Sequence, residues 1–137
     1  MISAKNTVVA HGVIFDEATK LVSIFNIMED LIVGGFPTFI QKIYYFSYFT
    51  REEGDSANIT LELIIKNNDK EIAKEPIQIN FGDKYKNRTR IELGGMPILE
   101  EGKMSFIVKH ETRELSKYEI SIKKINEPLA QNSGIER

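Results

Sequence analysis

Strict alternation of apolar and polar residues between positions 58 and 66 constrains the fold more than any other feature of the sequence. Every odd position in this run carries an aliphatic side chain, namely Ile59, Leu61, Leu63 and Ile65. The even positions are mostly polar. Because successive side chains of a β-strand point to opposite faces, the pattern indicates a strand with one buried face.

Similar runs recur along the chain and are separated by residues that favour turns. They cover positions 7–15, 21–27, 37–50, 70–81, 88–93, 104–109 and 117–123. Helical apolar stripes are missing, and at most residues 28–32 suit a single helical turn. Turn signals close to every 8–12 residues are typical of β-sandwiches, so we predict an all-β, two-layer antiparallel sandwich of about eight strands.

Proline and glycine mark two further features of this sandwich. Pro76 lies inside the run 70–81 and cannot donate a ladder hydrogen bond, so that run is either an edge strand or broken there. The tetrapeptides Gly34-Gly35-Phe36-Pro37 and Gly94-Gly95-Met96-Pro97 each precede a strand-like segment. We interpret them as a chance similarity or two similar bends, rather than as a duplication.

Length and composition indicate one globular domain. The chain has 137 residues, 42% of them hydrophobic, with a net charge of -2 and no cysteine. These values suit a single folded domain, which we place at residues 1–125, followed by a flexible tail at 126–137. The lack of cysteine excludes disulfides, thiolate zinc sites and a cysteine nucleophile. The slightly negative net charge argues against a protein whose whole surface binds nucleic acid.

Targeting signals are not recognisable in the sequence. No apolar run approaches the length of a membrane span, which is about 20 residues. The apolar stretch at 7–15 is interrupted by His11 and Gly12 and followed by acidic residues, unlike a secretory signal. We therefore expect a cytoplasmic protein that does not associate with membranes.

Residues that could support catalysis do not form a recognisable pattern. His11 and His110 are far apart in the sequence, and each lies on a predicted strand. The acidic pairs at 29–30, 52–53 and 100–101 suit solvated turns rather than two carboxylates facing across a cleft. We therefore predict no enzymatic activity, no cofactor and no metal site. An enzyme using His11 or His110 as its base is the least favoured of three alternatives.

Aromatic residues are crowded in one predicted strand. In the run 37–50, Tyr44, Phe46 and Tyr48 share one face, and Ile43, Tyr45 and Phe49 share the other. A sandwich strand buries only one face in its own core, so one aromatic set is left over. Either a part of the chain such as the 28–36 connection covers it, or it forms a docking patch. Our favoured prediction is a non-catalytic domain that associates with a protein partner through Tyr44, Phe46 and Tyr48, most simply as a two-fold homodimer.

Basic residues alternate with neutral ones between positions 84 and 90. In an extended segment, the four cations Lys84, Lys86, Arg88 and Arg90 would project from one side, about 6.6–6.8 Å apart. Such a row suits phosphates of a nucleotide, a nucleic acid or another anion, with Tyr85 available for stacking. Charges also protect sheet edges from aggregation, so the row has a purely structural interpretation as well. Anion binding by these four residues is our alternative function.

A family resemblance agrees with this outline. The strand-like segment at 20–27 is followed by a connection ending at Phe36-Pro37, a long aromatic strand, and the late sequence Gly102-Lys103-Met104-Ser105-Phe106. This layout resembles a group of small bacterial domains of unknown function with an immunoglobulin-like β-sandwich. The resemblance covers residues 7–125. It implies a binding or accessory role and supplies no catalytic residues.

Overall fold

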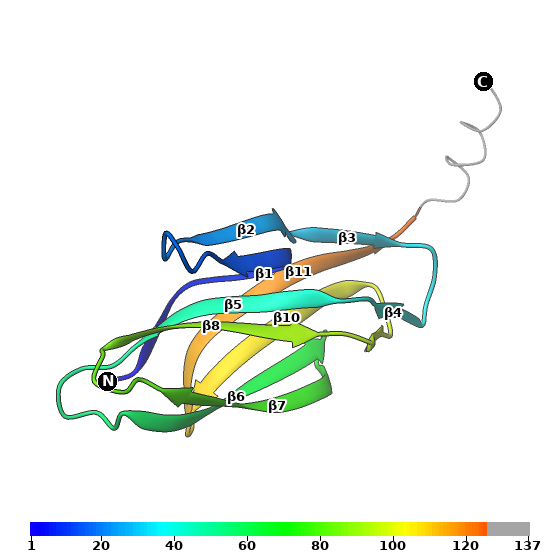
Figure 1. Cartoon of the computed structure of the whole chain (residues 1–137). Coiled ribbons are helices and arrows are strands. Elements are labelled where there is room, and N and C mark those ends of the chain that lie inside the picture. Colours follow the sequence, from blue (N-terminus) through cyan, green and yellow to red (C-terminus); the bar gives the residue numbers. More distant parts are fainter. Residues whose placement is uncertain (126–137) are drawn as a thin grey trace.

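The structure is a computed structural model, which describes residues 1–125 as eleven β-strands with no helix (Figure 1). Two larger sheets pack face to face, and a two-stranded ribbon closes one end. The prediction of an all-β, two-layer sandwich is confirmed. No helix in this part of the chain is suited to crossing a membrane. The tail predicted at 126–137 lies outside the described residues.

The first sheet carries the aromatic strand and the basic segment. Its strands follow the order β2-β1-β5-β8, and all of its pairs are antiparallel. The members are β1 (Ser3–Phe15), β2 (Val22–Ile27), β5 (Ile43–Thr50) and β8 (Lys86–Leu93). This order places β8, with its cations, directly beside the aromatic strand β5, so both features share one sheet.

The second sheet contains the strongly alternating segment of the sequence. Its order is β3-β11-β10-β6-β7, with β3 (Asp30–Val33), β6 (Asn58–Asn67), β7 (Lys70–Asn80), β10 (Gly102–His110) and β11 (Arg113–Lys124). Pro76 lies on the edge strand β7, which continues through it, as the missing donor allows. β3 pairs parallel to β11, so residues 28–32 do not form the helical turn that the sequence allowed.

The third sheet explains why eleven strands exist where about eight were expected. β4 (Thr38–Ile40) and β9 (Met96–Ile98) pair antiparallel, and each begins just after one of the two Gly-Gly sequences. The predicted strand 37–50 is therefore interrupted between β4 and β5. Strands of three or four residues are too short to show a period of two, so the sequence pattern missed β3, β4 and β9.

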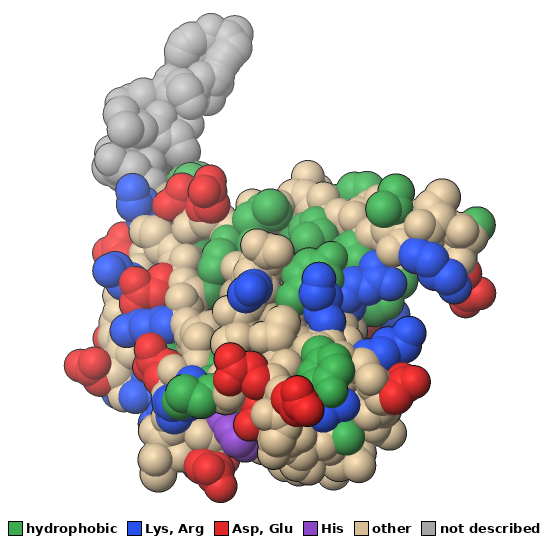
Figure 2. Space-filling model, turned by 90° about the vertical axis from the view of Figure 1, so that its left-hand side faces the viewer, with side chains coloured by type: hydrophobic (Ala, Val, Ile, Leu, Met, Phe, Trp, Pro, Cys, Tyr) green, Lys and Arg blue, Asp and Glu red, His purple; other side chains and the backbone are tan. Residues whose placement is uncertain are grey.

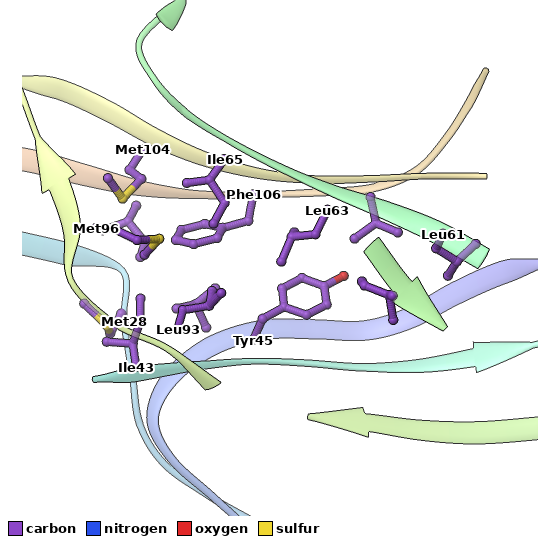
Figure 3. Packing of buried hydrophobic residues seen from close by; sticks show 14 of the residues in the cluster. Met28, Ile43, Tyr45, Leu61, Leu63, Ile65, Leu93, Met96, Met104 and Phe106 are labelled. Carbon is purple, nitrogen blue, oxygen red and sulfur yellow. The ribbon is translucent and has the colours of Figure 1, made fainter. Parts of the chain in front are cut away.

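Side chains from both large sheets form one buried cluster (Figure 3). Tyr45 of β5 packs between the layers, where it meets residues such as Leu63 of β6 and Phe106 of β10; all three are fully buried. Burial raises the pKa of the Tyr45 hydroxyl, whose oxygen lies 3.2 Å from the Ser116 hydroxyl. Each such large side chain contributes about 1.5–3 kcal/mol when buried, so this layer holds the sandwich together.

β1 folds back on itself, so that its last residues and β2 form a hairpin on the outer side of the first sheet (Figure 1). Val8 is the register partner of Phe46, yet the ring of Phe15 also lies 6.1 Å from the ring of Phe46. A straight strand would separate Val8 from Phe15 by about 23 Å, at about 3.3 Å per residue. Gly12 lies on the folded-back part, where an added Cβ would be 2.9 Å from Cδ2 of Phe25. The β1–β2 hairpin can therefore lie over β5 and β8.

Replacing Gly102 with alanine tests a close backbone approach at the start of β10. Gly102 has φ of 137°, and an added Cβ would be 2.1 Å from Oδ1 of Asn68, which accepts a hydrogen bond from the Lys103 amide. We expect G102A to lower the free energy of unfolding by about 1–3 kcal/mol in urea titrations. G35A is the matched control, because a Cβ on Gly35 has no neighbour within 4 Å. Equal losses in the two variants would contradict this account.

Candidate functional site

The outer aromatic face of β5 is partly covered by the chain itself. Tyr44, Phe46 and Tyr48 share this face as predicted, but Phe46 is only 1% exposed, whereas Tyr44 and Tyr48 are half-buried. The rings of Phe15 and Tyr48 meet Phe46 edge to face at 6.1 and 5.3 Å. The expectation of an open face is therefore wrong at Phe46. Its cover is the β1–β2 hairpin, which the sequence did not suggest, rather than the connection 28–36.

Two arginines of β8 attach the hairpin to the sheet. Arg88 donates a hydrogen bond of 2.7 Å to the carbonyl oxygen of Lys20, and Arg90 donates one of 2.8 Å to that of Val13. Both guanidinium groups also lie over the ring of Phe15, at 5.5 and 5.4 Å from its centroid. Charged donors and cation–π contacts each stabilise such a contact, so Arg88 and Arg90 have a structural role in addition to their charge.

The basic row has the geometry expected from its alternation, except at its first member. Lys86, Arg88 and Arg90 occupy alternate positions of β8. Their side chains lie on the same face of the sheet as the outer aromatic residues of β5. Lys84 lies before the strand, and its amide donates to the Phe81 carbonyl in a turn. Tyr85 is directed away from the row and packs on Arg51, with 4.5 Å between Cζ and the ring centroid. Tyr85 is therefore not the stacking partner of this row.

A groove lies between the hairpin and β8 (Figure 2). It has a volume of about 510 Å³, and its lining combines two aromatic rings with three cations: Phe15, Tyr48, Lys84, Lys86, Asn87 and Arg88. A second depression of about 270 Å³ shares Tyr48 and Lys86 with it and adds Lys5, Asn6 and Thr50. In Figure 2, part of the molecule projects to the right, and basic side chains gather around the hollow below it. The two depressions adjoin each other at Tyr48 and Lys86, and we call them together the cationic groove.

The cations around this groove lack acidic partners. Lys5, Lys84, Lys86 and Arg88 line it, and among the described residues none of them has a carboxylate within 4.0 Å. Three carboxylates lie nearby: Asp83 precedes Lys84 in the chain, Glu92 lies 4.0 Å from Lys42, and Asp16 accepts backbone hydrogen bonds in the hairpin turn, which lower its pKa. Because the whole chain carries a net charge of -2, this face is a local concentration of positive charge.

The histidines are placed in unrelated surroundings. His11 borders a pocket of about 380 Å³ whose other walls are mainly apolar, including Phe39, Ile40 and Ile98. His110 ends β10, next to the turn into β11. Of the acidic pairs, Glu52 binds the N-terminal amine and Glu100 accepts from Asn68. Within residues 1–125, no three histidine or acidic side chains are grouped to hold a metal ion.

Comparisons with known proteins support the fold and no more. No family model matches the chain, and no curated protein sequence matches it significantly. Among solved structures, the Pseudomonas fluorescens alkylpurine DNA glycosylase AlkC bound to DNA is similar at 11% identity and a TM-score of 0.50. This chain is covered to 89% but corresponds to only 30% of that protein.

Two other structures show the same kind of similarity. A Listeria innocua β-glucosidase in complex with glucose matches at 8% identity and a TM-score of 0.50, over 90% of this chain and 16% of the enzyme. An immunoglobulin-like protein, PA1606 from Pseudomonas aeruginosa, matches over 90% of this chain and 97% of its own length, at 12% identity and a TM-score of 0.41. At these identities the similarity concerns the sandwich fold alone.

Replacing Arg90 tests whether β8 holds the hairpin in place. We expect R90A to lower the free energy of unfolding by about 1–2 kcal/mol and to accelerate amide hydrogen exchange in the hairpin, since a hydrogen bond and a cation–π contact are lost. R90K should restore stability only in part, because an ammonium lacks the planar guanidinium. K86A is the control on the same strand. Identical exchange rates in all three variants would show that Arg90 does not hold the hairpin, which would leave Phe15 and Arg88 as its anchors.

Proposed function

We propose that this protein is a non-catalytic binding module whose cationic groove takes a single-stranded nucleic acid. The observation that carries this proposal is the set of four cations without carboxylate partners, Lys5, Lys84, Lys86 and Arg88, that line the groove together with the half-buried ring of Tyr48. A positively charged trough with an aromatic platform is the usual basis of single-strand binding, because phosphates meet the cations while a base stacks on the ring.

The shape of the groove favours a chain over a single small anion. The two depressions share Tyr48 and Lys86, so a ligand lying along them would extend from Lys84 on one side to Lys5 on the other. Cations are therefore distributed along a path instead of converging on one point. Such an arrangement suits several successive phosphates, and each neutralised phosphate releases counterions that contribute to the free energy of binding.

Tyr48 favours a single strand over a duplex. The ammonium of Lys86 lies 5.7 Å from the centroid of the Tyr48 ring, so cation and aromatic face are presented together. Only an unpaired base can turn its face toward such a ring, because the bases of a duplex are stacked on one another. The cytoplasmic location predicted from the sequence agrees with this ligand. The DNA named for AlkC carries no weight here, since that similarity concerns the fold alone.

Protein association, the function favoured by the sequence, is a second candidate. One specific observation favours it: large apolar side chains are exposed on the hairpin, where Leu21 is 65% and Ile27 51% exposed. This surface lies on the opposite side of the hairpin from Phe46. A partner that binds the protein through apolar contacts would therefore use the outer face of the hairpin, rather than Tyr44, Phe46 and Tyr48 of β5. An accessory role of this kind is also what the bacterial family resemblance implies.

Removing two lysines from the groove tests the electrostatic part of the proposal. We expect K84A/K86A to bind a fluorescein-labelled dT12 oligonucleotide more weakly than the wild type in anisotropy titrations. The slope of log K against log salt should become shallower by about 1.4, since each single-strand phosphate contact contributes about 0.7. K70A/K74A is the matched control, because these lysines of β7 form ion pairs with Glu100 and Glu62. Equal effects of the two double variants would contradict binding in this groove.

Changing Tyr48 tests the stacking part independently. Y48L should reduce affinity for dT12 roughly 5- to 150-fold, because stacking on an aromatic ring contributes about 1–3 kcal/mol per base. The salt slope should stay unchanged, since no cation is removed. Y48F keeps the ring and should bind like the wild type. If Y48L and Y48F bind equally well, no base stacks on this residue, and a ligand without bases such as heparin becomes the better match.

A further inference from the structure

One end of the sandwich contains a pocket that is separate from the cationic groove. It has a volume of about 380 Å³ and lies between β3, the β4–β9 ribbon and the start of β5, at the right-hand end of the molecule in Figure 1. Among the described residues, none lines both this pocket and the cationic groove. Small-molecule sites are typically concave and have volumes of about 300–1,000 Å³, so the size suits a small ligand. We call it the end pocket.

The floor and one wall of the end pocket are apolar. The side chains of the floor are buried and also belong to the main core; they are Met28, Ile40, Ile43 and Ile98. Figure 3 shows Met28 and Ile43 close together at one end of this core. The half-buried Leu31 and Val33, at alternate positions of β3, form the wall. An apolar part of a ligand would therefore leave water on entering the pocket, which is favourable.

Phe39 stands at the mouth of the end pocket as an exposed aromatic side chain. It lies on β4, where its register partner is Pro97, and it is 65% exposed, whereas the next residue, Ile40, is buried. β4 therefore directs one side chain into the core and presents the other beside the pocket. A ligand seated on the apolar floor would cover part of the Phe39 ring, which the rest of residues 1–125 leaves largely open to solvent.

The rim of the end pocket carries hydrogen-bond donors and a positive charge. His11, Gln41 and Lys42 line it, all three are exposed, and each side chain has an N–H group to donate. Within residues 1–125, no carboxylate lines the pocket, and Asp30 alternates to the opposite face of β3 from the pocket wall. Glu92 lies 4.0 Å from Lys42, but both side chains are exposed, and such a contact contributes little and is readily exchanged for another anion.

We infer that the end pocket binds a medium-chain fatty acid, with its alkyl chain on the apolar floor and its carboxylate at the rim. The ammonium of Lys42 and the N–H groups of His11 and Gln41 supply the donors that a carboxylate accepts. An alkylamine of the same length would meet the like charge of Lys42. A sugar or a dicarboxylate would place polar groups against the floor without partners, which is costly. The separation of an apolar floor from a cationic rim thus selects an anionic amphiphile.

Titration of the nitrogen-15-labelled full chain with sodium octanoate, without nucleic acid and below the micelle concentration, tests this inference by NMR. We expect saturable shifts of amide signals around the end pocket. Affinity should rise about fourfold for each methylene from butanoate to octanoate, because a buried CH₂ contributes about 0.8 kcal/mol. Octylamine should bind at least tenfold more weakly than octanoate. Absence of saturable shifts at the pocket, or equal binding of octanoate and octylamine, would overturn the inference.

A substitution in the pocket wall tests the apolar part. V33F places a ring in the pocket and should abolish octanoate binding. I32F is the matched control, because Ile32 is the preceding residue of β3, is exposed and faces away from the pocket. Thermal melts report whether both variants are folded. Octanoate binding by a folded V33F as tight as that of the wild type would contradict a site in this pocket.

Reversing the charge at the rim tests the carboxylate part even if V33F does not fold. K42E should bind octylamine in preference to octanoate, and K70E should keep the preference of the wild type, because Lys70 makes a similar exposed contact of 3.9 Å with Glu100 on the second sheet. An unchanged preference in K42E would overturn the inference. K84A/K86A should bind octanoate normally and V33F should bind dT12 normally, so this site and the cationic groove stand or fall separately.

Discussion

The packing of Phe15 on Phe46 is the contact on which the outer surface of this protein depends. Phe46 belongs to a strand whose inner face is fully occupied by the core, so its ring had to be covered from outside. The cover comes from the same strand that pairs beside it, because β1 folds back and returns its last residues to the sheet. The hairpin therefore forms one wall of the groove on the outer face of the sheet, and the adjacent strand β8 contributes cations to it.

Charge is distributed between the two sheets in different ways. On the second sheet, opposite charges are paired across neighbouring strands, as in Lys74 with Glu62 and Lys103 with Glu119. On the outer face of the first sheet, Lys86, Arg88 and Arg90 stand beside aromatic rings or backbone carbonyls instead, and only at the end of β8 does Glu92 pair with Lys42 among the described residues. Exposed ion pairs contribute little to stability, so the pairing on the second sheet mainly keeps that surface electrically neutral. The unpaired face is where the field of this slightly acidic protein attracts anions.

Local sequence patterns indicate the strands and the face of the sheet on which each residue lies, but not the contacts between distant segments. The alternation around Leu61 and Leu63 was sufficient to predict β6, and the alternation at 84–90 correctly placed Lys86, Arg88 and Arg90 on one face. Arg88 and Arg90 donate to the carbonyl oxygens of Lys20 and Val13. These partners are about 70 residues away in the chain, so no local sequence pattern could indicate the contacts. The pattern identifies the runs 7–15 and 21–27 as strands. The fold-back that turns them over Phe46 depends on tertiary packing, which a period of two does not encode.

Arg88 has two roles: its guanidinium donates a hydrogen bond to the hairpin, and the residue also lines the groove. A phosphate that takes its hydrogen bond from Nη1 of this group competes with the carbonyl oxygen of Lys20 for that donor. Occupancy of the groove and attachment of the hairpin are therefore thermodynamically linked, and by reciprocity each changes the other's equilibrium constant by the same factor. The hairpin therefore competes with a ligand at Arg88, and the more stably the hairpin is attached, the lower the affinity for that ligand.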